Sequence, residues 1–268
     1  MRWKYFLQVL SASLKISKTR GVKFQPCPDL LTFSQKLVEG NHLPTEIALL
    51  AGKIYCFGRV CVSEEITVKE LLSLALKATK IPKICYLSGI IDILQEAVDE
   101  EKSVILLGET IIDLLKSYSS KYYYSLKLLH TWLLYIKSTC LTRSNESIVY
   151  TKFLEPDGEI LQILQMHWET PFAGCVELCS DCLSTICQIW HNVQPNCLYA
   201  ELLTKTTLTD LLWKSKTKYL ILSTLVPFIR FSEILCEHPD SVYSLTGSLN
   251  SNYLLPAGNS ILRASCII

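Results

Sequence analysis

The sequence predicts an all-α protein built from stacked antiparallel helix pairs, as in HEAT or armadillo α-solenoids. Apolar residues recur at three- and four-residue steps along nearly the whole chain, and the strict alternation that marks strands is scarce. The joints between periodic segments are short and polar, and many segments are apolar on two sides. Each such helix needs a neighbour before and after it, which favours a stacked array over a compact bundle. With 268 residues, of which 49% are hydrophobic, the chain can bury a substantial core.

In the N-terminal half, the periodicity predicts a series of helices with recognisable starts and stops. We expect the second helix to be capped near Asp29. Thr67 and Glu70 form a capping box, in which a hydroxyl and a carboxylate bind free backbone amides at a helix start. The helix that follows is expected to stop before Pro82. The segments predicted to be helical are 30–38, 43–54, 71–76, 84–98, 104–115 and 122–136.

In the C-terminal half, two further helices are predicted with most detail. Asp157 is expected to cap a helix that ends near Trp168, and Pro171 stands where proline is tolerated at the start of the next helix. A short apolar piece is expected at 148–154, and shorter helices at 198–203, 208–213 and 218–231. The helix after Pro171 has a core-facing seam of Phe172, Val176, Cys179, Leu183, Ile186 and Trp190.

Two regions are therefore expected. Residues 1–237 form the helical-repeat region, although no strict sequence repeat is present. Residues 238–268 are rich in Ser, Asn, Gly and Thr, which breaks the apolar periodicity. We expect this segment to be a poorly ordered C-terminal tail.

The first 28 residues are basic and contain no acidic residue, which allows two interpretations. One is a mitochondrial transit segment, because serines are interspersed among the basic residues. The other, which we favour, is an amphipathic helix whose apolar stripe contains Phe6, Val9, Leu10 and Leu14.

Composition and charge narrow the class of protein. The 26 basic and 25 acidic residues nearly balance, which gives no global electrostatic reason to expect nucleic acid but leaves room for a local basic patch. No run approaches the roughly 18 apolar residues that a membrane span needs. The 12 cysteines lie largely in periodic segments, where a free thiol packs as a small hydrophobic group. We expect a soluble, cytoplasmic protein with reduced thiols and no membrane insertion.

One cysteine motif allows a catalytic interpretation. Cys175, Cys179 and Cys182 stand at C-x3-C-x2-C, a spacing used by iron–sulfur enzymes of the radical S-adenosylmethionine type. Here the three lie inside a predicted helix, within a narrow arc of its core-facing side. Asp181 stands where those enzymes usually have an aromatic residue. We therefore favour core packing. The iron–sulfur enzyme, and a zinc site that adds a histidine to two of these thiols, are the alternatives.

The densest local basic cluster is a candidate contact surface. Lys205, Lys214, Lys216 and Lys218 are interleaved with aromatic residues, a combination that RNA-binding surfaces use for phosphate contact and base stacking. The other interpretation is a solvated junction between helices. No P-loop, nucleophile elbow or dinucleotide fingerprint is present in the sequence, so we expect no catalytic residue, cofactor or metal site.

Two segments resemble a known family. The run His-Trp-Glu-Thr-Pro-Phe at 167–172 resembles the Trp-Glu-x-Pro-Leu helix start of the thyroid adenoma-associated protein family. The run Leu-Leu-Trp-Lys-Ser-Lys-Thr-Lys-Tyr at 211–219 resembles a later segment of that family, at a fitting distance. Ala173 departs from the pattern, where the family often has an aspartate. The resemblance covers about 160–236.

The resemblance implies a non-catalytic scaffold. Members of this family partner a tRNA 2′-O-ribose methyltransferase and direct it to the first nucleotide of the anticodon loop, and the subunit that binds S-adenosylmethionine is a separate polypeptide. Members are far longer than this chain, so the resemblance implies that it corresponds to an internal portion. A generic protein–protein adaptor with no RNA role is the alternative.

Overall fold

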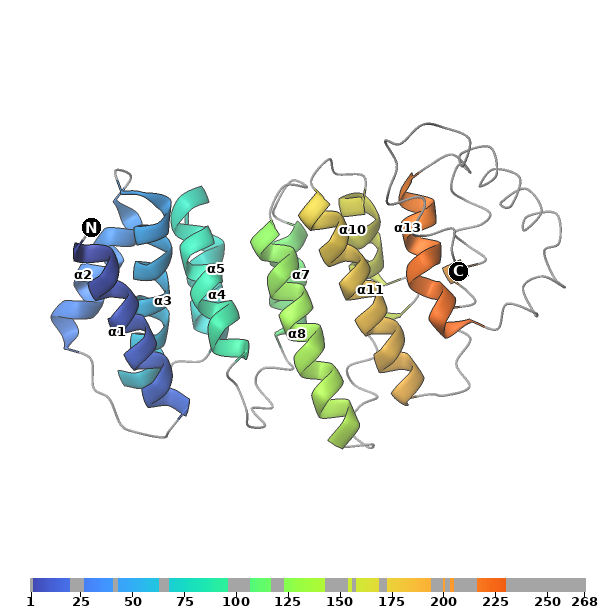
Figure 1. Ribbon diagram of the computed structural model, residues 1–268, viewed down its shortest axis with the longest axis horizontal. Helices are drawn as coiled ribbons and strands as arrows, with labels where there is room; N and C mark the ends of the chain where they lie inside the picture. The colour runs from blue at the N-terminus through green and yellow to red at the C-terminus, as the bar shows by residue number, and fades with distance from the viewer. Residues whose placement is uncertain are drawn as a thin grey trace, which may run out of the picture. The chain divides into compact units, whose positions relative to one another are not determined.

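Most residues that the structure describes are helical, and none of them lies in a strand (Figure 1). This confirms the all-α fold class that the spacing of apolar residues predicts. The chain divides into two compact units: unit 1 covers Met1–Tyr135 and unit 2 covers Ile136–Ile268. The computed structural model describes residues 2–19, 27–40, 43–62, 68–95, 107–116, 123–142, 154–155, 158–168, 173–193, 200, 203–204 and 216–229.

Unit 1 is a set of helices that pack in pairs. Its strongest packing joins α3 to α5, with α1 and α2 also lying against α3. The division between the units falls within α8. The helices are α1 (Arg2–Thr19), α2 (Pro28–Glu39), α3 (Thr45–Val62), α4 (Val68–Lys77), α5 (Lys80–Gln95), α7 (Gly108–Lys116) and α8 (Tyr123–Thr142).

The pairs stack on one another through their second helices. α4 and α5 form an antiparallel pair, because only residues 78–79 separate them, and α2 and α3 are joined by a similarly short connection. α3 and α5 lie side by side and run in the same direction, since Gly52 lies against Cys85 and Cys56 lies against Gly89. Antiparallel pairs whose second helices stack in parallel are the arrangement expected of a helical-repeat protein.

Two glycines allow α3 and α5 to approach closely. A Cβ atom added at Gly52 would lie 2.4 Å from the carbonyl oxygen of Cys85, and one added at Gly89 would lie 2.8 Å from the Cβ atom of Cys56. Non-bonded carbon atoms ordinarily sit about 3.5–4.0 Å apart, so neither position has room for a side chain. The Cys56 thiol donates a hydrogen bond to the carbonyl oxygen of Tyr86 at 3.6 Å. Small residues on both helices therefore set their separation.

The predicted N-terminal helix is present as α1, but its predicted apolar stripe is partly wrong. Leu7 and Leu14 are buried, whereas Phe6 and Val9 are 53% and 66% exposed and Leu10 is half-buried. Leu7 and Leu14 lie two turns apart on one face, and the packing of α1 against α3 buries that face. α1 carries apolar residues on more than one side, and packing against α3 selects one of them.

Several helix boundaries in unit 1 differ from the prediction. α2 begins at Pro28, and Asp29 lies in its first turn without making a capping hydrogen bond. α5 includes Pro82 in its first turn, because the amides there have no acceptor within the helix and a missing N–H costs nothing. α3 and α8 continue beyond their predicted ends, while α4 and α7 occupy their predicted segments. Thr67 of the predicted capping box lies outside the described residues.

Unit 2 is described over fewer residues. α10 packs against α11, and α11 packs against α13 (Figure 1). α13 ends at Leu225 and a 3-10 turn follows, so the helix predicted over 218–231 is wrong in its second half. Pro227 lies in that turn, where proline is compatible with the backbone but cannot extend an α-helix. The elements are α10 (Glu159–Trp168), α11 (Ala173–Val193), α13 (Lys216–Leu225) and η2 (Val226–Phe228).

Four of the six residues predicted to form the seam on α11 are buried, whereas Val176 is half-buried and Phe172 lies outside the described residues. Cys179, Leu183, Ile186 and Trp190 all have exposures of 9% or less. The indole Nε1 of Trp190 also donates a hydrogen bond to the carbonyl oxygen of Leu154 at 2.8 Å, which ties α11 to a residue far back in the sequence. Trp190 is thus part of the core and also donates a hydrogen bond.

Other predictions fall outside the described residues. These include the capping residue Asp157, most of the piece at 148–154, the helix at 208–213 and the tail at 238–268. Residues 200 and 203–204, within or next to the predicted helix at 198–203, are helical and buried. None of the described helices combines the length and apolarity that crossing a bilayer requires.

Candidate binding groove

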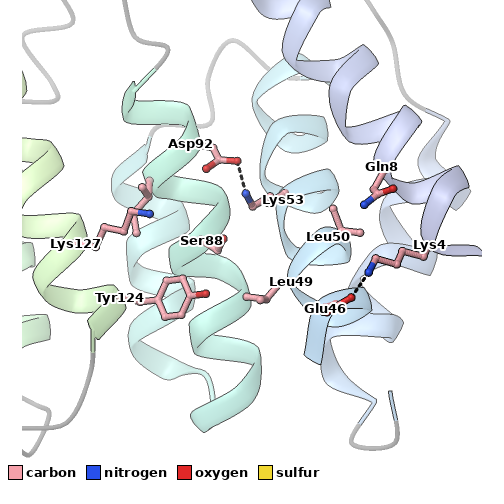
Figure 2. Close-up of a pocket in the computed structure, with 11 residues that line it drawn as sticks. Lys4, Gln8, Glu46, Leu49, Leu50, Lys53, Ser88, Asp92, Tyr124 and Lys127 are labelled. Carbon is pink, nitrogen blue, oxygen red and sulfur yellow. Dashed lines mark hydrogen bonds and ion pairs between the residues drawn. The ribbon is translucent and has the colours of Figure 1, made fainter. Parts of the chain in front are cut away.

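A groove of about 370 Å³ crosses unit 1 and takes side chains from four helices (Figure 2). α1, α3, α5 and the first turns of α8 contribute to it, and α3 and α5 are the second helices of the two stacked pairs. Its lining side chains are Lys4, Gln8, Glu46, Leu49, Leu50, Lys53, Ser88, Ile91, Asp92, Tyr124 and Lys127. Charged groups of both signs and aliphatic side chains therefore share one surface.

An ion pair joins α1 to α3 at one end of the groove. The ammonium of Lys4 donates a hydrogen bond to a carboxylate oxygen of Glu46. That hydrogen bond and the charge of Glu46 raise the pKa of Lys4 above its ordinary value, and the same contact lowers the pKa of Glu46. Both side chains are well exposed, so the pair contributes little to stability. The contact favours the charged form of both side chains.

A second, more sheltered ion pair joins α3 to α5. The Nζ atom of Lys53 lies 2.7 Å from Oδ2 of Asp92, and these side chains are 28% and 23% exposed. In Figure 2 the two groups face each other across the gap between the helices. The pair holds a positive and a negative charge at fixed positions in the middle of the groove.

The α8 end of the groove carries an aromatic and cationic group. The Nζ atom of Lys127 lies 5.9 Å from the centroid of the Tyr123 ring, a cation–π distance. Tyr124 packs edge-on against Tyr123, with ring centroids 5.7 Å apart, and its side chain is half-buried. Burial raises the pKa of the Tyr124 hydroxyl, followed by smaller contributions from neighbouring groups that include Asp92. The hydroxyl therefore stays protonated and can donate a hydrogen bond.

The structure leaves the predicted basic cluster untested. Lys205 and Lys214 lie outside the described residues. Lys216 and Lys218 belong to the first turn of α13, but their side chains are not among those the structure describes. Their contact with RNA or a partner stays a prediction, and they belong to unit 2, whereas the groove lies in unit 1.

The three cysteines of the C-x3-C-x2-C motif lie on α11 and are buried, with exposures of 2%, 0% and 0% for Cys175, Cys179 and Cys182. Desolvation by burial raises the pKa of all three thiols. A metal or cluster needs thiolates, and this environment favours the neutral thiol. Among the described residues, no group of three or more potential ligands is arranged to hold a metal ion. The prediction that these cysteines pack in the core is confirmed.

The groove residues were not predicted from the sequence. A weak signal was present, because each helix has lining residues spaced by three, four or seven, as in Tyr124 and Lys127 or Glu46 and Lys53, beside two adjacent pairs. Such spacing places two residues on one helix face. It does not tell which face of which helix will lie beside them, so the groove appears only in the packed structure.

Comparison of this chain with known protein families, with curated proteins and with solved structures gives no match. The class of protein is therefore defined by its architecture, an all-α fold of stacked helix pairs.

Proposed function

We propose that this chain is a non-catalytic helical-repeat scaffold that binds its partners on the row of α1, α3, α5 and α8. The observation that carries this proposal is the groove that takes side chains from all four helices. Two interhelical ion pairs, Lys4–Glu46 and Lys53–Asp92, place charges of both signs on this surface, and such patterns give specificity for a complementary surface. Helical-repeat proteins commonly bind partners on such continuous faces.

In its finer form, the proposal names the partners. The resemblance over about 160–236 supports a cytoplasmic regulatory subunit that directs a tRNA 2′-O-ribose methyltransferase to the anticodon loop. Its partners are then the catalytic subunit of that methyltransferase and tRNA. Lys205, Lys214, Lys216 and Lys218 are the candidate RNA or partner contacts in this scheme.

The segment that carries the resemblance has a packing role. Trp168 is the last residue of α10 and is 3% exposed, and α11 begins at Ala173, shortly after Pro171. The Trp168 side chain is therefore part of the core at the end of α10. The resemblance therefore concerns how a scaffold is built, in keeping with a subunit whose catalytic partner is another polypeptide.

The experiment that tests the finer proposal measures ribose methylation of tRNA. Deleting the gene should abolish 2′-O-methylation at the first anticodon nucleotide in the affected tRNAs, and expressing the full chain should restore it. A variant carrying Lys216→Glu and Lys218→Glu should restore less, whereas Lys69→Glu, an exposed position on α4, should restore as much as the parent chain. Unchanged methylation after deletion would exclude the tRNA role.

The second candidate is a protein–protein adaptor without an RNA role. The mixed charge of the groove favours it, because Glu46 and Asp92 line the same surface as the three lysines and would repel a phosphate backbone. Unchanged methylation together with a stable, purified complex between this chain and a protein partner would support the adaptor.

A further inference from the structure

The charges of the groove alternate along the row of helices. Lys4 on α1 is paired with Glu46 on α3, and Lys53 on α3 is paired with Asp92 on α5. The α1–α3 and α3–α5 junctions are thus each bridged by one ammonium and one carboxylate. At the next junction, between α5 and α8, Lys127 lines the groove.

Lys127 lacks a carboxylate partner within the part of the chain that the structure describes. Its described contact is the ring of Tyr123, at 5.9 Å from the ring centroid. The hydroxyl of Tyr124 lines the groove from the same helix (Figure 2). An ammonium and a hydroxyl that line the same groove can both donate hydrogen bonds to an oxyanion. At the two preceding junctions the lysine is already paired with a carboxylate.

The rest of the lining suits a protein segment better than a nucleic acid. The three lysines and two carboxylates of the groove leave one net positive charge, which is too small to attract a polyanion strongly. Leu49 and Leu50, which are half-buried, supply an aliphatic surface between the charged groups. An aliphatic side chain can cover that surface, whereas a sugar–phosphate backbone cannot.

We propose that this groove receives a segment of a partner protein in which Asp or Glu stands beside an aliphatic residue. The partner's carboxylate accepts hydrogen bonds from Nζ of Lys127 and Oη of Tyr124, and its aliphatic side chain covers Leu49 and Leu50. At the α5–α8 junction the partner's carboxylate pairs with Lys127, as Glu46 pairs with Lys4 and Asp92 pairs with Lys53. This inference rests on the proposed scaffold function and names the chemistry of its partner.

The test uses the full chain and a labelled probe in a fluorescence anisotropy titration. The probe is a short helical peptide with Glu and Leu at four-residue steps. Its counterpart has Gln in place of every Glu, and an RNA anticodon stem-loop is titrated in parallel. We expect the Glu peptide to bind and the Gln peptide to bind at least tenfold more weakly, because a hydrogen bond to a charged group is worth about a factor of ten.

Variants of the chain locate the contact. Lys127→Ala should weaken binding of the Glu peptide roughly tenfold, and Tyr124→Phe, which removes only the hydroxyl, should weaken it several-fold. Lys69→Ala, at an exposed position outside the groove, should leave the affinity unchanged. Higher salt should weaken binding of the Glu peptide to the parent chain and have less effect on the Lys127→Ala variant.

Three results would overturn the inference. These are no binding of the Glu peptide, equal binding of the Glu and Gln peptides, or an affinity that Lys127→Ala does not change. Binding of the RNA stem-loop that is lost in Lys127→Ala, without peptide binding, would assign the groove to RNA instead. Each result can occur with tRNA methylation either dependent on the gene or independent of it, so the outcome is separate from the test of the proposed function.

Discussion

The close approach of α3 and α5 makes a specific prediction about two glycines. Alanine is a better helix former than glycine by about 1 kcal/mol, so Gly52→Ala and Gly89→Ala would each stabilise an isolated helix. In the packed structure the new Cβ atom at Gly52 would lie 2.4 Å from the carbonyl oxygen of Cys85 and 2.6 Å from its carbonyl carbon. These are backbone atoms, so no change of rotamer can relieve the overlap.

The expected magnitude follows from these distances. Restoring an ordinary contact requires the two helices to separate locally by about 1 Å, which forfeits packing around the contact. Overpacking of this kind costs typically about 1–3 kcal/mol, occasionally more. We expect Gly52→Ala to lower the free energy of unfolding by about 2–3 kcal/mol after the gain in helix propensity. Gly89→Ala should cost less, about 1 kcal/mol, because its nearest neighbours are side-chain atoms of Cys56.

The assay is urea denaturation followed by far-ultraviolet circular dichroism, with a matched double variant. Cys56→Gly removes the Cβ and Sγ atoms that lie 2.8 Å and 2.9 Å from the added Cβ at Gly89. It should therefore offset part of the cost of Gly89→Ala, and the coupling free energy between the two changes should favour the double variant. The same Cys56→Gly change should not rescue Gly52→Ala. A Gly52→Ala protein as stable as the parent, or more stable, would refute the close packing of α3 against α5.

Three further predictions concern other contacts. Trp190→Phe removes the donor to the carbonyl oxygen of Leu154 and should lower the free energy of unfolding by roughly 1–3 kcal/mol, while Trp190→Ala should cost roughly 3–5 kcal/mol; a change near zero in urea denaturation would mean that this side chain is not buried. Burial raises the pKa of the Cys187 thiol to about 12 from an ordinary value of 9.0. The contribution of the neutral thiol to the free energy of unfolding is therefore fully present below pH 9 and is lost as the pH rises towards 12. Between pH 8 and pH 10 the parent chain should therefore lose about 1.4 kcal/mol more stability than Cys187→Ala, and equal losses would contradict this burial. Reversing one charge of the pair Lys53–Asp92 should cost about 1 kcal/mol in the same assay, and exchanging both residues should restore most of it; no recovery in the double variant would show that the pair is not formed.

The periodicity of apolar residues was sufficient to predict that the described segments are helical, although not where each helix ends. On α11, the residues Cys179, Leu183, Ile186 and Trp190 alternate by four and three, and all four are buried. This works because the rise and rotation of an α-helix fix which residues share a face, whatever surrounds the helix. The same reasoning assigned the cysteines of α11 to the core in preference to a cluster.

The periodicity was insufficient where a helix has apolar residues on more than one side. On α1 the predicted stripe included Phe6 and Val9, which are exposed, and missed Leu7, which is buried. A hydrophobic stripe shows which faces can be buried. Which of them is buried depends on the helix that packs beside it, in this case α3.

The candidate groove depends on tertiary structure even more strongly. Its ion pairs join Lys4 to Glu46, and Lys53 to Asp92, between different helices. No local rule aligns such distant residues, because their proximity depends on the rotation and register of each helix against its neighbour. The small residues at Gly52 and Gly89 help to set that register for α3 and α5.

The sequence by itself therefore determined the all-α class, the helical segments and the residues able to form a core, because these follow from backbone geometry and the burial of apolar surface. Only the tertiary structure decided which face of α1 is buried, how closely α3 and α5 approach, and which charged side chains line one groove. These features are contacts between helices, and their geometry is set by the packing of side chains from segments far apart in the chain.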